Sequence, residues 1–312
     1  MRIIIQEDNI DKRVDVLLSE LLREKSLTRT VIQEYISQGC SVNNRVCKKS
    51  YRFKEGDVFT VDEEYWESVK KGLDKDTEIV PQRKELDIRY EDSDLMVLFK
   101  PKGLVVHPGV NNMENTLANY IRYYLESKGE YDELMDRSGI VHRLDKGVSG
   151  LMVVAKKKGT EEYLKKKFKK GEVIRIYLAE LEKSTDIEQK FNPYKYIKEL
   201  SIEVEPWKEW SKTEGYIGRS TLNRYKMEFK RYKFPGSKEA LSYLLFVNKY
   251  ALVKLETGRM HQIRATLEYL GYSIKGDNLY GMAKGDGSNI MLEAVLLSFV
   301  KPDGERIILK TE

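Results

Sequence analysis

One acidic residue of this chain stands between two cations in a segment rich in glycine. The segment Gly139–Lys156 reads GIVHRLDKGVSGLMVVAK, with Asp145 between Arg143 and Lys146. Neighbouring cations favour the ionised carboxylate, whereas partial burial disfavours it, and acids under such opposed influences are candidate nucleophiles or bases. Because Asp beside Gly also caps ordinary turns, a purely structural role for Asp145 is the competing interpretation.

Two apolar runs flank this acid and would hold it in place. Ile140–Val141 precedes it, and the run Leu151–Ala155 follows it. Short continuous apolar runs that are bounded by turn residues are typical of buried strands. We therefore expect Asp145 to occupy a rigid turn between two strands of the core.

A second segment, Thr257–Gly281, combines a predicted helix with two arginines. Its apolar residues recur at positions i, i+3, i+7 and i+10, with Thr257 able to cap the start and Gly271 the end. Arg259 and Arg264 fall in the first two turns, where the helix dipole disfavours a cation. This placement indicates a compensating anion, either a protein carboxylate or a nucleic-acid phosphate, with a surface salt bridge as the simpler alternative.

A third pattern is the strict alternation of Glu172–Glu180, EVIRIYLAE, which predicts a strand. One face of this strand carries isoleucine and leucine, and the other carries Arg175 and Tyr177. We expect Tyr177 to face out of the core beside a cation. The alternative is that it packs within the core, as most strand tyrosines do.

The three histidines, His107, His142 and His261, all lie in segments that contain glycine and raise the question of a metal site. Carboxylates such as Asp145 or Asp277 could complete a ligand set. No pair of the histidines shows ligand spacing, however, so we predict no metal. The chain also lacks a glycine-rich motif that would cradle a phosphate.

Composition restricts the class of protein. The chain has 312 residues, 41% of them hydrophobic and 34% charged, which is typical of a globular protein with a well-solvated surface. No apolar run approaches the ~18 residues that a membrane span needs, and the acidic start lacks a signal-peptide pattern. We expect a cytoplasmic protein without membrane association. Cys40 and Cys47 lack zinc or redox spacing and are predicted to be buried thiols.

The net charge is only +5, so the placement of the charges matters more than their total. In Lys156–Lys170 eight lysines surround Tyr163, Leu164 and Phe168, as in an amphipathic helix with a cationic outer face. That face is either a solvated surface or a stripe that follows RNA phosphates.

The first sixty residues predict a separate small module. Apolar residues recur at helical spacing in two stretches, and Gly39 is placed to end the second helix. Short strand-like pieces follow at Ser41–Val42, Arg45–Val46 and Val58–Val61. Two helices followed by small strands form a module that is too small to do much chemistry by itself.

The chain is assigned three parts on this basis. Residues 1–62 form the small module, and residues 63–81 are polar without apolar periodicity, as in a linker. Residues 82–312 alternate strand-like and helical runs and form a larger domain. Within that domain residues 183–215 lack a clear period and are interpreted as an insertion.

The N-terminal module resembles the S4-type RNA-binding domain. The matching residues include Arg13–Val14–Asp15, Gly39–Asn44 and Lys54–Asp57. This resemblance implies that the first two helices present basic residues, such as Arg13 and Arg29, to RNA phosphates. An unrelated small α/β module is the alternative interpretation.

Four long motifs in the rest of the chain occur in the order typical of the RluA-type pseudouridine synthases. They are Leu86–Asp92, Lys100–Gly109, Gly139–Lys156 and Thr257–Gly281. Their amino-acid sequences resemble most the RluD-like branch of that family, which also carries an N-terminal S4 domain. The resemblance implies an α+β fold, in which a mixed, mostly antiparallel sheet with a central cleft forms the catalytic domain beside a small S4-like α/β domain.

The same resemblance implies roles for individual residues. Asp145 is the catalytic aspartate, Tyr177 packs against the target base, and Arg264 pairs with the aspartate. Arg143 helps to hold the RNA with its base extruded. The further residues that the motifs imply in RNA or substrate binding are His107, His142, Arg259, His261 and Gln262.

The resemblance further implies an isomerase that converts specific uridines of large-subunit (23S) ribosomal RNA, free or in pre-ribosomal particles, as a monomer and without a cofactor. The sequence departs from the family pattern at Val148, Arg175, Thr266 and Glu293. These departures keep open a second hypothesis, a catalytically inactive RNA-binding factor of ribosome assembly. A metal-dependent RNA hydrolase that uses the three histidines is a third.

Overall fold

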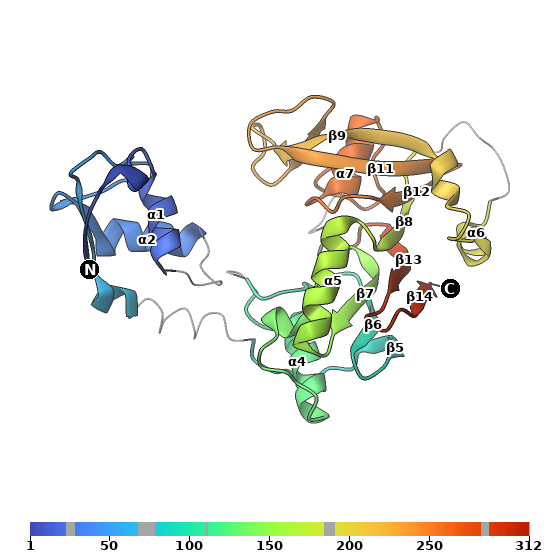
Figure 1. The fold of residues 1–312 in the computed structure, drawn as a ribbon. Helices are drawn as coiled ribbons and strands as arrows, with labels where there is room; N and C mark the ends of the chain where they lie inside the picture. Colours follow the sequence, from blue (N-terminus) through green and yellow to red (C-terminus); the bar gives the residue numbers. More distant parts are fainter. Residues whose placement is uncertain (23–28, 68–78, 110–111, 184–190, 282–286, 312) are drawn as a thin grey trace. The chain divides into compact units, whose positions relative to one another are not determined.

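The chain divides into two units, Met1–Glu78 and Ile79–Glu312 (Figure 1). The computed structural model describes residues 1–22, 29–67, 79–109, 112–183, 191–281 and 287–311. Among the helices within these ranges, none is long and apolar enough to cross a membrane.

The first unit packs two helices on a small sheet. Helices α1 (Val14–Leu22) and α2 (Arg29–Gly39) accompany four strands in the order β1-β4-β2-β3. The sequence predicts both helices and three of the strands, whereas β1 has too few residues to show a period. The strands are β1 (Arg2–Ile4), β2 (Cys40–Val42), β3 (Arg45–Val46) and β4 (Val58–Val61).

The first unit extends past the boundary predicted at residue 62. Residues 63–67 form a helical turn, and the buried ring of Trp66 lies 5.0 Å from that of Tyr35, measured between ring centroids. An indole buries a large apolar area, which brings the start of the predicted linker into the core. Residues 68–78 of that linker lie outside the described residues. Cys40 and Cys47 are buried free thiols, as predicted.

The second unit is built on a ten-stranded sheet. The strand order is β10-β9-β11-β12-β8-β13-β7-β6-β5, and β14 pairs with β13. Among the described strands, only the β13–β7 pair is parallel, so the predicted mixed, mostly antiparallel sheet is confirmed. The strands are β5 (Asp87–Glu91), β6 (Leu95–Lys100), β7 (Ser149–Ala155), β8 (Ile174–Glu180), β9 (Ser211–Arg219), β10 (Met227–Lys230), β11 (Lys238–Val247), β12 (Tyr250–Leu255), β13 (Leu292–Val300) and β14 (Arg306–Lys310).

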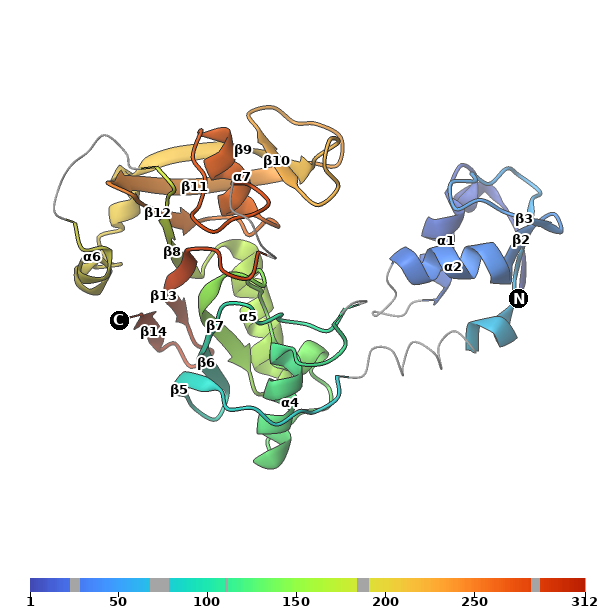
Figure 2. The same cartoon turned by 180° about the vertical axis from the view of Figure 1, so that it is seen from behind.

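Helices cover both faces of this sheet (Figures 1 and 2). On one face Met152 and Val154 of β7 pack with α4 (Leu117–Ser127) and α7 (Gln262–Tyr269). On the other face Leu151 and Val153 pack with α5 (Lys158–Lys170). Every residue of β7 is buried, which explains the continuous apolar run after Asp145.

The prediction that Tyr177 faces out of the core is wrong. The alternation along β8 is present, because Ile176 and Leu178 pack on one face of the sheet and Tyr177 on the other. Both faces are covered, however, and Tyr177 is only 6% exposed. Periodicity identifies the two faces of a strand but not whether the second one meets solvent.

The described part of the predicted insertion contributes to the core. Helix α6 (Pro193–Glu199) and the 3-10 turn η3 (Pro206–Glu209) bring Trp207 and Trp210 into a cluster with Ile176 and Leu252 of the sheet. The buried residues of this segment are large side chains at irregular spacing, not a repeated apolar face. The sequence of the segment therefore shows no hydrophobic periodicity. Residues 184–190 lie outside the described residues.

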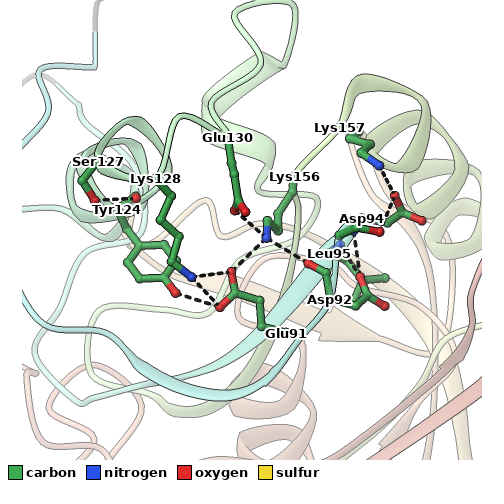
Figure 3. A network of polar contacts seen from close by, with 11 residues as sticks. Glu91, Asp92, Asp94, Leu95, Tyr124, Ser127, Lys128, Glu130, Lys156 and Lys157 are labelled. Atoms are coloured by element: carbon green, nitrogen blue, oxygen red, sulfur yellow. Dashed lines mark hydrogen bonds and ion pairs between the residues drawn. The ribbon is translucent and has the colours of Figure 1, made fainter.

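A network of ion pairs lies at the C-terminal end of β7, whereas Asp145 precedes the N-terminal end (Figure 3). The buried ammonium group of Lys156 lies 2.9 Å from Oε1 of Glu91 and 2.6 Å from Oε2 of Glu130, and it donates to the Asp92 carbonyl at 2.9 Å. A buried charge is tolerated when it is paired and hydrogen-bonded in this way. The network joins the β5–β6 hairpin and the segment after α4 to the end of β7.

Gly150 of β7 should tolerate no side chain. Its φ is 127°, and an added Cβ would lie 2.4 Å from the backbone nitrogen of Ala294 on β13. Gly150→Ala should therefore lower the free energy of unfolding by about 2 kcal/mol or more, because both backbone conformation and space oppose the methyl group. Denaturant unfolding measures the change.

Gly159 provides the matched control for this prediction. It lies in α5, and a Cβ there would meet nothing within 4 Å. Gly159→Ala should leave stability unchanged or raise it by about 0.5 kcal/mol, because alanine favours helix. Similar losses of stability in both variants would contradict the assignment of close approach to Gly150.

Candidate active site

Asp145 is held by a side chain from a distant part of the chain. Its Oδ2 accepts a hydrogen bond from NH1 of Arg264 at 3.0 Å and lies 3.8 Å from Nε2 of His261. The Asp145 side chain is 25% exposed. In the described part of the chain its Oδ1 takes part in no hydrogen bond. One carboxylate oxygen is therefore anchored, while the other remains available to a substrate.

The turn that carries Asp145 is fixed on both sides. The N–H of Val148 donates to the carbonyl of Asp145 at 3.1 Å and closes the turn. At Gly147 the chain passes so close to Gly287 that a Cβ would come within 2.1 Å of the Gly287 carbonyl oxygen. The rigid turn that the glycines predict is thus produced by packing against a distant segment.

A fully buried lysine, Lys100, ties an earlier motif to this turn. Its ammonium group donates to the carbonyls of Pro101 and Leu104 at 2.8 Å and of Lys146 at 3.3 Å. Burial lowers the pKa of Lys100 to about 8, although the charge of Asp145 acts in the opposite direction. At neutral pH the group is still a cation, and its hydrogen bonds hold the backbone on both sides of the turn in place.

Arg264 is in turn fixed by a second carboxylate, Asp277. Nε and NH2 of Arg264 donate to the two oxygens of Asp277 at 2.7 and 2.9 Å, and both side chains are buried. The N–H groups of Leu279 and Tyr280 also donate to Asp277 Oδ1, each at 3.0 Å. One edge of the planar guanidinium is therefore held by Asp277, which directs NH1 at Asp145.

Pairing keeps Arg264 and Asp277 charged despite their burial. Burial by itself would lower the pKa of Arg264 and raise that of Asp277. The hydrogen bonds and attraction between the two groups outweigh burial, so the pKa of Arg264 is raised and that of Asp277 is lowered. A buried positive charge is thus available to Asp145 in a place where solvent screens it little.

Tyr280 connects Arg264 to His261. Its ring centroid lies 4.8 Å from the central carbon of the Arg264 guanidinium, and its hydroxyl lies 3.0 Å from Nδ1 of His261. The hydroxyl also accepts from the N–H of Met227 at 2.7 Å and donates to the Met227 carbonyl at 3.1 Å. The tautomer of the His261 ring determines which atom donates in the contact between Nδ1 and the hydroxyl.

His261 therefore faces Asp145 with Nε2. Its φ of 53° is in the left-handed region, which is uncommon for a residue with a side chain and is often found at functional sites. Burial lowers the pKa of His261, although the charge of Asp145 opposes this. The ring nitrogen nearest to the carboxylate is thus Nε2, 3.8 Å from Oδ2 of Asp145.

Helix α7 begins at Gln262, later than the Thr257 start that the sequence predicts. Oε1 of Gln262 accepts from the N–H of Arg259 at 3.0 Å and from the Thr257 hydroxyl at 2.8 Å. Its Nε2 donates to a backbone and a side-chain oxygen of β11. Arg259 therefore lies in the preceding loop, and the buried amide of Gln262 has no hydrogen-bonding group left for RNA.

His142 lies behind the catalytic turn. The N–H of Val153 donates to its Nε2 at 3.0 Å, and its ring stacks on Phe168 with centroids 4.6 Å apart. Nδ1 is also buried, and burial lowers the pKa of the ring to about 3. His142 thus fastens the turn to β7, and its predicted contact with RNA receives no support from this position.

The other predicted RNA-binding residues fall in two places. Arg143 is exposed beside Asp145, and His107 lies near it, since burial together with the charges of Arg137 and Arg143 lowers the pKa of His107 to about 4. In the first unit Arg13 donates to Asp15 through Nε at 2.9 Å. Arg29 begins α2, and its side chain lies outside the described residues.

Most lysines of the predicted cationic helix are paired with acids. The ammonium groups of six of the eight lie within 4.0 Å of a carboxylate, which favours a solvated surface over a stripe that follows phosphates. These six are Lys156, Lys157, Lys158, Lys165, Lys167 and Lys170.

Comparison with known proteins decides the family. A family profile described as RNA pseudouridylate synthase matches residues 94–269, which include Asp145, Tyr177 and Arg264. The chain belongs to the RNA pseudouridylate synthase family. Members of this family are isomerases that convert uridine to pseudouridine in RNA, so the predicted class of enzyme is confirmed.

Individual relatives agree with this membership. An uncharacterized RNA pseudouridine synthase of Helicobacter pylori is 35% identical, over 95% of this chain and 84% of that protein. The ribosomal large subunit pseudouridine synthase D of Borreliella burgdorferi is 34% identical, over 68% of this chain and only 60% of that protein. The solved human RNA Pseudouridylate Synthase Domain Containing 1 shares the fold, with a TM-score of 0.51 and 22% identity over 73% of this chain and 83% of that one.

Sequence reasoning missed Lys100 and Tyr280 as parts of the site and considered Asp277 only as a metal ligand. All three lie within the recognised motifs, but their partners become visible only when the chain is folded. Within the described ranges, no group of three or more His, Cys, Asp or Glu side chains could hold a metal ion.

Asp277→Asn should lower the free energy of unfolding by about 3 kcal/mol at neutral pH, because it leaves the buried Arg264 guanidinium facing a neutral amide. The folded pKa of Asp277 lies below its ordinary value of 3.8. Its carboxylate therefore stabilises the fold above that value, and this stabilisation is lost as the pH falls through the folded pKa.

The difference in stability between native protein and Asp277→Asn should be largest above about pH 5 and shrink below about pH 4. Denaturant unfolding across this range measures it. Asp87→Asn, at a side chain that is 49% exposed, is the control and should change stability little at any pH. A difference for Asp277→Asn that is independent of pH would contradict the assignment.

Proposed function

We propose that this protein isomerises specific uridines of large-subunit (23S) ribosomal RNA to pseudouridine, with Asp145 as the catalytic carboxylate. The observation that carries the proposal is the geometry of Asp145, whose Oδ2 is anchored by Arg264 while Oδ1 remains open. The RNA class is supported by similarity to proteins named ribosomal large subunit pseudouridine synthase D, among them that of Yersinia pestis, which is 30% identical over 89% of this chain.

The reaction exchanges one bond for another within the same nucleotide. The bond between ribose C1′ and N1 of uracil breaks, the uracil turns, and C1′ bonds to C5. C5 loses a proton and N1 gains one, so the product has the same atoms as uridine. The protein must therefore activate the ribose, retain the detached uracil and hold the RNA with its target base extruded.

Asp145 is suited to activate the ribose in either of two ways. Its ionised Oδ1 attacks C1′ or removes a proton from C2′, and both steps need an open carboxylate oxygen with a fixed direction. Arg264 supplies that direction without occupying Oδ1. The buried ammonium group of Lys100 holds the same turn through the carbonyl of Lys146.

Tyr177 is suited to retain the uracil. Burial raises the pKa of its hydroxyl, and the negative charge of Asp145 adds to this effect, so the side chain is neutral and lies close to the carboxylate. The ring is 6% exposed, so the released base contacts only the small part of it that faces the reacting sugar.

The cations around this centre are suited to the RNA backbone. Arg143 and Arg137 are exposed near His107, and Arg143 is two residues from Asp145, where they can bind phosphates of an extruded nucleotide. An S4-type function of the first unit would add contacts through Arg13 and Arg29. We further propose that the protein acts as a cytoplasmic monomer, on free ribosomal RNA or in pre-ribosomal particles.

Asp145→Asn should reduce the rate of pseudouridine formation by at least about a hundredfold, because the amide cannot act as nucleophile or base. Binding of RNA should change less than about twofold, since the amide has nearly the same shape and most affinity comes from phosphate contacts. Mapping of pseudouridine in ribosomal RNA from deletion cells that carry the native or the variant gene measures activity.

Glu133→Gln is the control for this experiment, because Glu133 is an exposed acid in the loop that precedes the catalytic motif. It should restore every site that the native protein restores. An active Asp145→Asn protein would show that Asp145 is not the catalytic group. An unchanged pseudouridine map in the deletion cells would exclude ribosomal RNA as the substrate and would instead favour a binding factor without catalysis.

A further inference from the structure

The two cysteines of the chain lie opposite each other in one hairpin of the first unit. Strands β2 and β3 pair in an antiparallel register that places Ser41 opposite Val46 (Figure 2). Continued by one residue, this register places Cys40 opposite Cys47. The chain contains no further cysteine, so any disulfide within one molecule joins these two residues.

Both thiols face the same side of this hairpin. Cys40 is 5% exposed and Cys47 is 9% exposed, and both belong to the core of the first unit. Val46, on the other face of the hairpin, is 75% exposed. The Sγ of Cys47 donates to the carbonyl oxygen of Cys40 at 4.0 Å. The two side chains are therefore neighbours across the hairpin.

The turn of the hairpin fixes the separation of the two cysteines. It contains two residues, Asn43 and Asn44, with φ angles of 52° and 60°, as in the tight turns that match the twist of paired strands. Oδ1 of Asn43 accepts from the N–H of Val58 on β4 at 2.9 Å, which holds the turn in place. Directly opposite residues of antiparallel strands have Cα atoms about 4.5–5.5 Å apart, and a disulfide spans about 4.4–6.8 Å. The register alone thus brings this pair within the range of a disulfide.

The two strands differ in how freely they move. β2 lies between β4 and β3, whereas β3 is the edge strand of the described sheet. A disulfide needs Cβ atoms about 1 Å closer together than an ordinary cross-strand pair, so one strand must move inward. The edge strand is free to make this movement, because only β2 pairs with it in the part of the chain that the structure describes. A disulfide closed in this way is strained, and strained disulfides are easily reduced.

We propose that Cys40 and Cys47 are a redox-sensitive modification site, at which a small-molecule disulfide such as oxidised glutathione closes a reversible bond between β2 and β3. The thiolate of Cys47, the more exposed of the two, attacks one sulfur of oxidised glutathione, and one glutathione leaves as its thiolate. The Cys40 thiolate then attacks the Cys47 sulfur and releases the second glutathione. The two protein thiols lose two electrons and two protons, and the two glutathione thiolates take both up.

Burial makes this exchange slow. It raises the pKa of Cys40 to about 12, and the charges of Cys47 and Asp62 add to the effect. It also raises the pKa of Cys47, although a backbone hydrogen bond opposes this. Because only the thiolate attacks, the rate of exchange should rise roughly tenfold for each unit of pH near neutrality. The pair therefore responds to prolonged rather than brief oxidation.

The test incubates the full-length protein in buffers of fixed reduced and oxidised glutathione concentrations and then blocks free thiols with an alkylating reagent. Both thiols should disappear together, and the mass of the chain should fall by two hydrogen atoms with no glutathione retained. Trypsin cleaves after Arg45, between the two cysteines. The disulfide should therefore appear as a linked pair of peptides that dithiothreitol separates.

The denatured chain is the matched control, since it carries the same two thiols without the hairpin. The native protein should be half oxidised at a value of [GSH]²/[GSSG] at least about tenfold higher than the denatured chain, because the fold holds the thiols together. Cys40→Ala should retain one glutathione on Cys47, because no second thiol displaces it.

The inference is overturned if both thiols of the native protein stay free, if each retains its own glutathione, or if the disulfide joins two chains, which appear as a dimer on a non-reducing gel. Equal half-oxidation values for the native and the denatured chain would also overturn it, because the hairpin would then contribute nothing. The inference does not rest on the proposed function, and these measurements leave that function to its own test.

Discussion

The candidate active site depends on the buried guanidinium of Arg264. A positive charge in the protein interior is stable only when carboxylates satisfy it, and here Asp277 occupies two of its nitrogens while Asp145 occupies a third. Because the guanidinium is planar and Asp277 holds one of its edges, NH1 points in a fixed direction. NH1 in turn fixes the orientation of the Asp145 carboxylate. Because pairing satisfies only Oδ2, the same contact that orients the carboxylate leaves its other oxygen open.

The rest of the second unit supports this arrangement from both sides. A sheet buried on both faces fixes β7 and with it the turn before it, and the Lys156 network fastens the far end of that strand. On the other side α7 carries Arg264, and Tyr280 joins the guanidinium to His261 and to the start of β10. Contacts from both sides thus fix the position of the carboxylate.

Sequence patterns predicted the parts of the site that lie within one motif. The turn of Asp145, the strand character of β7 and the helix that carries Arg264 all follow from local spacing, and the family resemblance pairs Asp145 with Arg264. Burial of Tyr177 did not follow, because alternation cannot show that a helix covers the second face of a sheet. The burial of the Gln262 amide could not be predicted either, because its partners on β11 are distant in the sequence. The same holds for most acids that pair with the α5 lysines, which are identified only in the folded chain.

The dependence of Asp145 on Asp277 through Arg264 is tested most directly by a double-mutant cycle on the single-turnover rate of pseudouridine formation. If Asp277 acts through Arg264, Asp277→Asn lowers this rate roughly tenfold or more at unchanged RNA affinity, and it has little further effect once Arg264 is replaced by Lys. Equal effects of Asp277→Asn in the native and the Arg264→Lys backgrounds would contradict this dependence.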